Sequence, residues 1–136
     1  MQLKNGQHIN YPQNIDDVLI YQDEKIVTLI ITNLLYNSIK YSPEDSDIDI
    51  VIDFTKDGMI LKIIDQGIGI PDNDQKHIFE RYFRAANALL NQGTGIGLNI
   101  IKGHIDNLKG KVYFKSKENK GSTFTVELPI GEIINA

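Results

Sequence analysis

The chain has 136 residues, 41% of them hydrophobic and 24% charged, which is typical of a single globular domain. Its net charge of −4 argues against a nucleic-acid-binding surface, and the absence of cysteine excludes disulfides and thiolate metal sites. No apolar run reaches the roughly 18 residues of a membrane span, and no secretory signal opens the chain. We therefore expect residues 1–136 to form one cytoplasmic domain without direct membrane contact.

The first half of the sequence predicts strands and one long helix. Two short strands are expected at 8–11 and 18–21. Asp23 can cap a helix that runs to about Tyr41, where Ser42 and a proline end it. Isoleucine alternates with aspartate over 47–54, which predicts a strand with one buried face. A hairpin turn then leads into a returning strand over 59–65.

The second half begins with a loop of glycines and proline, followed by a short helix near 74–81. A further helix is expected over about 96–108, with Gly110 as its C′ residue. A closing hairpin is expected over 111–116 and 122–128. Together these elements predict an α+β fold, a two-layer sandwich in which helices pack on one face of a mixed sheet.

The long helix carries polar residues beside its apolar face. At about 100° per residue, Asn33, Asn37, Lys40 and Tyr41 share an arc next to the apolar one. The apolar arc comprises Val27, Ile30, Ile31, Leu34, Leu35 and Ile39. A solvated face rich in amides would explain the polar arc. The alternative is a ligand-facing strip, because amide oxygens suit Mg²⁺ and lysine suits phosphate.

A glycine loop, Asp65–Ile70, directly follows the second strand of the predicted hairpin. The carboxylate of Asp65 would lie at the strand end. It could accept a hydrogen bond from the exocyclic amine of adenine but would repel the carbonyl oxygen of guanine. The alternative is a plain turn in which Asp65 bonds to its own backbone.

A second glycine loop, Gly93–Leu98, leads into the next helix. The free N–H groups and positive dipole of a helix N-terminus favour phosphate. The loop lacks the lysine of a P-loop and the spacing of a Rossmann loop, so by itself it indicates phosphate binding only weakly.

Taken in order, these segments resemble the sequence boxes of the histidine kinase family, within the GHKL superfamily of ATP-binding domains. Asn33–Ser42 resembles the N box and Asp65–Ile70 the G1 box. Phe79–Arg84 resembles the F box and Gly93–Leu98 the G2 box. Gly121–Phe124 resembles the closing strand that backs the adenine. Each box is a weak signal alone, but four in this order are specific.

The resemblance, which covers residues 4–130, implies that the chain binds ATP and Mg²⁺ in a Bergerat-type fold. Asn37 would ligate Mg²⁺. Asn33 would lie beside Asn37, Lys40 would meet the phosphates, and Arg84 would approach the terminal phosphates. Asn33, Lys40 and Arg84 are the candidate catalytic residues. Asp65 would read the adenine amine. The other residues implied to line the nucleotide are Tyr41, Gly67, Gly69, Ile70, Gly93, Thr94, Gly95, Ile96, Gly97, Leu98 and Thr123, the last through a water.

The same resemblance implies a mobile lid over residues 85–95, hinged on the glycines of the second loop. For Phe79 and Phe83 we expect core packing that anchors this lid. Contact with ATP is not expected of either ring.

The function implied is transfer of the γ-phosphate of ATP to a histidine on a separate dimerisation hairpin, in two-component signalling with a response regulator as an indirect partner. A phosphoacceptor histidine is followed by an acidic residue, whereas His8, His77 and His104 are each followed by isoleucine. The hairpin is therefore expected elsewhere in a longer parent, and attachment of that parent to a membrane is compatible with the sequence. The chain alone is expected to bind ATP without phosphorylating itself.

Three alternatives remain at this point. The related hydrolases resemble one another in placing an acid where this chain has Asn33, which cannot act as a general base near neutral pH. A stand-alone serine kinase of the anti-sigma-factor type fits the length but not the Lys40–Ser42 run. A nucleotide-binding regulatory module without catalysis would need no further residues.

Overall fold

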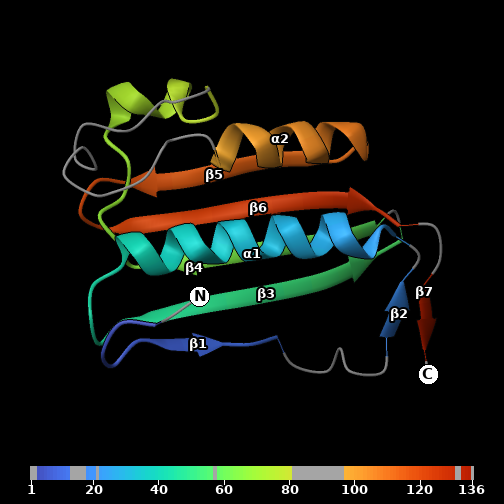
Figure 1. Ribbon diagram of the computed structural model, residues 1–136, viewed down its shortest axis with the longest axis horizontal. Helices are drawn as coiled ribbons and strands as arrows, with labels where there is room; N and C mark the ends of the chain where they lie inside the picture. Colours follow the sequence, from blue (N-terminus) through green and yellow to red (C-terminus); the bar gives the residue numbers. More distant parts are fainter. Residues whose placement is uncertain are drawn as a thin grey trace.

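A mixed sheet of five strands forms one layer of the fold (Figure 1). In spatial order the strands are β1 (His8–Asn10), β3 (Asp47–Thr55), β4 (Gly58–Asp65), β6 (Gly121–Pro129) and β5 (Lys111–Lys117). β1 runs parallel to β3, and the other neighbouring strands pair antiparallel. This computed structural model describes residues 3–12, 18–20, 22–56, 58–80, 97–130 and 133–135.

Two helices cover one face of this sheet, as Figure 1 shows. They are α1 (Glu24–Tyr41) and α2 (Gly97–Asn107). Asp23 begins α1 by accepting a hydrogen bond from Ile26 N at 3.1 Å, and Ser42 ends it in an extended conformation. A short 3-10 helix, η1 (Asp72–His77), follows β4, and a second sheet pairs β2 (Val18–Ile20) antiparallel with β7 (Ile133–Asn135).

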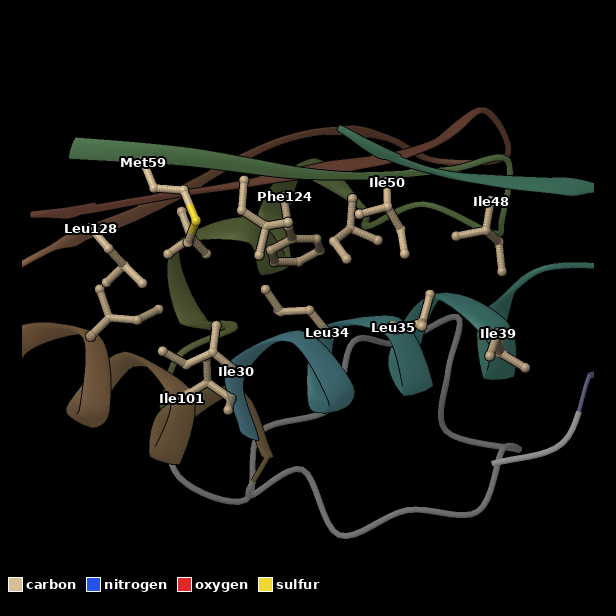
Figure 2. Packing of buried hydrophobic residues seen from close by; sticks show 14 of the residues in the cluster. Ile30, Leu34, Leu35, Ile39, Ile48, Ile50, Met59, Ile101, Phe124 and Leu128 are labelled. Atoms are coloured by element: carbon tan, nitrogen blue, oxygen red, sulfur yellow. The ribbon is translucent and has the colours of Figure 1, made fainter. Parts of the chain in front are cut away.

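The core lies between the helices and the inward face of the sheet (Figure 2). Alternation along β3, β4 and β6 turns every second side chain toward the helices. Burial of each large apolar side chain stabilises the fold by roughly 1.5–3 kcal/mol. The labelled core residues are Ile48, Ile50, Met59, Phe124 and Leu128 from the sheet and Ile30, Leu34, Leu35, Ile39 and Ile101 from the helices.

The predicted α+β sandwich and the bounds of α1 are confirmed, whereas two local predictions are wrong. The helix expected near 74–81 is a 3-10 helix that begins at Asp72. The C′ residue of α2 is Lys109, with φ of 63°, and Gly110 comes one position later. Gly110 N donates to Ile105 O at 2.9 Å and Lys109 N to Asp106 O at 3.0 Å, the Schellman pattern. Gly110 is needed for a different reason, since a Cβ there would collide with Glu127 O.

Candidate functional site

The C-terminal end of α1, the end of β4 and the β5–β6 turn meet at one edge of the sheet (Figure 1). The loop after β4 lies directly against the helix end. Ile68 N donates to Tyr41 O at 3.1 Å, and a Cβ on Gly67 would lie 2.5 Å from the same oxygen. Gly69 has φ of 67°, and a Cβ there would collide with Lys117 O. Glycines in this loop therefore allow the close approach of three backbone segments.

Asp65 ends β4 as a buried carboxylate, 9% exposed. Its Oδ1 accepts hydrogen bonds from Gly67 N at 2.9 Å and Ser122 N at 3.2 Å, and its Oδ2 accepts one from Ser38 Oγ at 3.2 Å. The bond to Gly67 N is that of the plain turn, while the other two donors come from α1 and β6. Recognition of adenine by Asp65 stays a prediction.

The electrostatic setting of Asp65 is unusual for a carboxylate. Burial raises the pKa of Asp65, and the hydrogen bonds from Gly67 N, Ser38 and Ser122 N lower it. In the described part of the chain no salt bridge reaches this group. A carboxylate that is buried among neutral donors retains the capacity to accept a hydrogen bond from a ligand.

The polar arc of α1 lies at the edge of the core. Asn33, Asn37, Lys40 and Tyr41 are all half-buried, whereas Tyr36 on the outer side of the helix is 52% exposed. Asn33 Nδ2 donates to Leu29 O at 2.8 Å, and Lys40 Nζ lies 5.3 Å from the centroid of the Tyr41 ring. This partial burial is intermediate between a solvated face and a closed core face, as expected for a strip that borders a site.

Residues that the sequence interpretation missed fix the first glycine loop to the sheet. Ser116 Oγ accepts a hydrogen bond from Ile70 N at 2.8 Å and lies 2.7 Å from Ser122 Oγ. Gln75 Nε2 donates to Ile70 O at 3.1 Å and to Ser116 O at 3.0 Å. Strand alternation could have revealed both serines, because they share the inward face with Phe114 and Phe124 two residues away.

This network changes the roles expected of three residues. Gly67 N and Ile70 N already donate to Asp65 and Ser116, so any contact that Gly67 and Ile70 make with a nucleotide would use other atoms. Thr123 pairs with Ile64 and Lys115, and alternation turns its side chain to the face opposite Ser122. Ser122, which donates to the Asp65 carboxylate, therefore replaces Thr123 as the β6 residue beside it.

The predicted second glycine loop is described only where α2 begins. Gly97 and Leu98 form the first turn of α2, and a Cβ on Gly97 would meet nothing within 4 Å. Part of the predicted set lies outside the described residues: Phe83, Arg84, the lid over 85–95 and, within it or next to it, Gly93, Thr94, Gly95 and Ile96.

Core packing of Phe79 is confirmed. Its ring meets Phe114 edge-on with centroids 6.0 Å apart, and Phe114 stacks on Phe124 at 5.6 Å. This aromatic row holds the segment after η1 against the sheet.

The donor set near α1 fits Mg²⁺ bound together with phosphates. Mg²⁺ keeps several waters and takes one or two protein oxygens when phosphates supply the others. Asn37 offers such an oxygen at the half-buried edge of α1. The described residues contain no group of three or more His, Cys, Asp or Glu side chains placed to hold a metal unaided. Among those same residues, no helix is long and apolar enough to cross a membrane.

A two-layer sandwich with a buried strand-end carboxylate, an adjoining glycine loop and a polar helix edge defines a nucleotide-binding domain of the GHKL type. The family model described as histidine kinase-, DNA gyrase B- and HSP90-like ATPase matches residues 22–132. The chain therefore belongs to this family, and within it is a catalytic ATP-binding domain of the histidine kinase kind.

Curated relatives and solved structures agree with this assignment. The chain is 35% identical to sensor histidine kinase WalK of Bacillus subtilis over 132 residues, which is 93% of this chain and 22% of WalK. It is 38% identical to sensor protein CiaH of Streptococcus pneumoniae over 113 residues, 82% of this chain and 26% of CiaH. The structure of mycobacterial sensor histidine kinase MprB superposes with a TM-score of 0.76 at 26% identity, covering 91% of this chain and 82% of that one. The chain thus spans about a quarter of the length of these curated relatives.

Proposed function

We propose that the chain binds ATP with Mg²⁺ at this edge of the sheet and donates the terminal phosphate to a histidine on a dimerisation hairpin of the parent protein. The response regulator would then receive the phosphate from that hairpin. The names of the two relatives above, a sensor histidine kinase and a sensor protein, support this role over the serine-kinase alternative. We also propose that the domain works in the cytoplasm.

The buried carboxylate of Asp65 carries the proposal. A buried carboxylate that forms no ion pair within the described residues costs free energy even when it is hydrogen-bonded, and binding of a ligand would explain why it is there. Its oxygens can accept from the 6-amino group of adenine but can donate nothing to the 6-carbonyl of guanine while Asp65 is ionised. Adenine specificity follows from this single group.

The phosphates would extend along the polar arc of α1. Asn37 would hold Mg²⁺, which supplies neutralisation of phosphate charge when bound. Lys40 and, outside the described residues, Arg84 would add positive charge, while Tyr41 and the first turn of α2 at Gly97 and Leu98 would line the nucleotide.

Transfer would form a bond between a histidine nitrogen and the terminal phosphorus. The bond from that phosphorus to the β–γ bridging oxygen breaks, ADP leaves, and the imidazole loses its N–H proton. The domain contributes positioning and electrostatic stabilisation to such a reaction. Asn33 is neutral, so a water molecule in the same place would lack a general base, which favours transfer over hydrolysis.

Asp65→Ala tests adenine recognition. We expect it to weaken ATP binding by roughly 1.5–3 kcal/mol, the scale of a hydrogen bond to a charged group. Isothermal titration calorimetry with Mg-ATP measures the effect, and circular dichroism controls for folding. Equal affinities in two folded proteins would remove Asp65 from the site.

Asn37→Ala tests the metal. We expect the variant to lose the Mg²⁺ dependence of ATP binding while its affinity for adenosine barely changes, because adenosine carries no phosphate. A magnesium titration at fixed ATP provides the measurement. An unchanged magnesium titration would indicate that the polar arc of α1 is a solvated face.

A further inference from the structure

Ser38 directly follows the proposed magnesium ligand, Asn37, in α1, but we infer a different role for its side chain. Its side chain is 3% exposed, on the inward side of α1. Serine is a weaker helix former than alanine, and a buried hydroxyl is unfavourable unless it is hydrogen-bonded. Here the hydroxyl donates to Asp65 Oδ2 at 3.2 Å. Alanine would be sufficient for packing at this position. The hydroxyl is therefore explained by the carboxylate of Asp65, to which it donates.

The two oxygens of Asp65 are held in different ways. Oδ1 receives two backbone donors, Gly67 N at 2.9 Å and Ser122 N at 3.2 Å. Among the residues that the structure describes, Oδ2 receives only the Ser38 hydroxyl. Each carboxylate oxygen can accept about two hydrogen bonds. Oδ2 is therefore the oxygen with capacity left for a ligand, and the single group that orients it is a side chain.

We propose that Ser38 is a positioning residue for purine recognition, whose hydroxyl keeps Asp65 oriented and ionised so that Oδ2 accepts from a 6-amino group and rejects a 6-carbonyl. The proposal rests on the proposed function, in which Asp65 reads the adenine amine. It adds that discrimination between purines depends on the Ser38 hydroxyl, although this hydroxyl donates its hydrogen bond to Asp65 and not to the base.

Apart from its three hydrogen bonds, few interactions in the described structure stabilise the ionised form of Asp65. Among the described residues, the charged side chains that line a hollow of about 440 Å³ next to Asp65 are those of Lys115, Lys117 and Lys120, and alternation turns Lys115 and Lys117 to the face of β5 opposite Ser116. None of these lysines forms a salt bridge with Asp65 in the described structure. Burial raises the pKa of this carboxyl, and its three neutral donors oppose that rise.

Loss of the Ser38 hydroxyl therefore has two consequences. The pKa of Asp65 rises further, so the acid-side loss of ATP binding moves to higher pH. A protonated Asp65 also gains a donor, which can meet the 6-carbonyl of hypoxanthine. ATP and inosine triphosphate, which differ at this position of the purine, should respond in opposite directions as the pH falls.

The test is calorimetric titration of Mg-ATP and of Mg-inosine triphosphate across mildly acidic to neutral pH. Ser38→Ala should reduce the ratio of the two affinities on the order of tenfold and move the acid limb of ATP binding to higher pH. Ser38→Cys, a weak donor of similar size, should behave like alanine, whereas Ser38→Thr should retain the ratio. Ser46→Ala is the matched control, because Ser46 is also buried but donates to Pro43 O at 2.7 Å, away from Asp65.

The outcomes distinguish a failure of the role proposed for Ser38 from a failure of adenine recognition by Asp65. If Ser38→Ala and Ser38→Cys keep the wild-type ratio and acid limb while Asp65→Ala weakens ATP binding, the role of Ser38 is overturned and adenine recognition by Asp65 stands. If Asp65→Ala also binds ATP like the wild type, adenine recognition fails and the role of Ser38 fails with it.

Discussion

The ionised carboxylate of Asp65 that the proposed site requires lowers the stability of the nucleotide-free protein. Because burial raises the pKa of this carboxyl, its ionised form is less favourable in the folded chain than in the unfolded one. A group shifted in this direction contributes stability that is fully present below its unfolded pKa. That contribution is lost as pH rises through the folded pKa, so at neutral pH Asp65 destabilises the nucleotide-free fold.

We expect Asp65→Asn to raise the melting temperature of the nucleotide-free protein near neutral pH. The amide oxygen can still accept from Gly67 N and Ser122 N, and the amide NH₂ can donate to Ser38 Oγ. The gain should shrink as the pH is lowered and the wild-type carboxyl becomes protonated. Thermal unfolding followed by circular dichroism across this range measures it. A variant less stable than the wild type at neutral pH would contradict the argument.

At the scale of an element, the end of α1 is closed by the segment that precedes β1. The last carbonyls of a helix lack partners within it and favour a nearby cation. Gln7 Nε2 donates to Ile39 O, Ser42 O and Pro43 O at 3.1–3.2 Å. Lys4 Nζ donates to Ser42 O at 2.7 Å and to the carbonyl of Lys40 at 2.9 Å. The helix end that carries the polar arc is thus held by two side chains from upstream.

We expect Gln7→Ala to lower the free energy of unfolding by about 1–3 kcal/mol, because it removes the side-chain donor to Ile39 O and one of the two side-chain donors to Ser42 O and to Pro43 O. Gln7 is 4% exposed. Gln22→Ala is a suitable control, since the two hydrogen bonds of the Gln22 side chain are exposed, one donated to Pro129 O at 2.6 Å and one accepted from Asp23 N at 2.9 Å, and their loss should have a smaller effect. Urea denaturation of both variants provides the comparison. Equal effects would show that the closure of α1 adds no stability.

The elements differ in how far the sequence could predict them. α1 and β3 were predictable because their apolar periods and end signals, such as Asp23, are local. The strand order and the pairing of β2 with β7 depend on contacts between distant segments, which no local pattern encodes. The end of α2 was misplaced by one residue because a lysine, Lys109, adopts the left-handed conformation usually given to glycine.

The sequence motifs of the candidate site were predictable, but the hydrogen bonds between its residues were not. Motif spacing indicated Asp65, Asn37 and the glycine loops. Ser38 and Ser122 lie within two of the motifs but were assigned no role there, since their importance comes from hydrogen bonds to Asp65, which ends β4. Residue type and spacing along one chain do not reveal which hydroxyl faces which carboxylate in space.

At the scale of the whole molecule, the described structure gathers groups suited to holding a nucleotide, while its histidines are poorly placed to accept phosphate. His8 lies on the edge strand β1. The ring of His77 bonds to Glu80 at 2.8 Å in η1, and His104 lies in the last turns of α2. Each is followed by isoleucine, whereas a phosphoacceptor is followed by an acid. The binding groups and the nucleophile are therefore expected on different parts of the parent protein.

We expect the chain alone, incubated with radiolabelled Mg-ATP, to bind nucleotide, release phosphate negligibly and incorporate no label. Asn33 offers no general base to water, and none of the described histidines is a suitable nucleophile. Addition of the histidine-bearing hairpin of the parent should produce label on the hairpin that is stable to base and labile to acid, as a phosphoramidate is. Asn37→Ala, which should lose the metal, is the control for transfer once circular dichroism has shown that the variant is folded. Rapid phosphate release by the chain alone would indicate a hydrolase, and acid-stable label on a hydroxyl would indicate a serine kinase. An unlabelled hairpin, despite proven Mg-ATP binding and a folded partner, would indicate a binding module without catalysis.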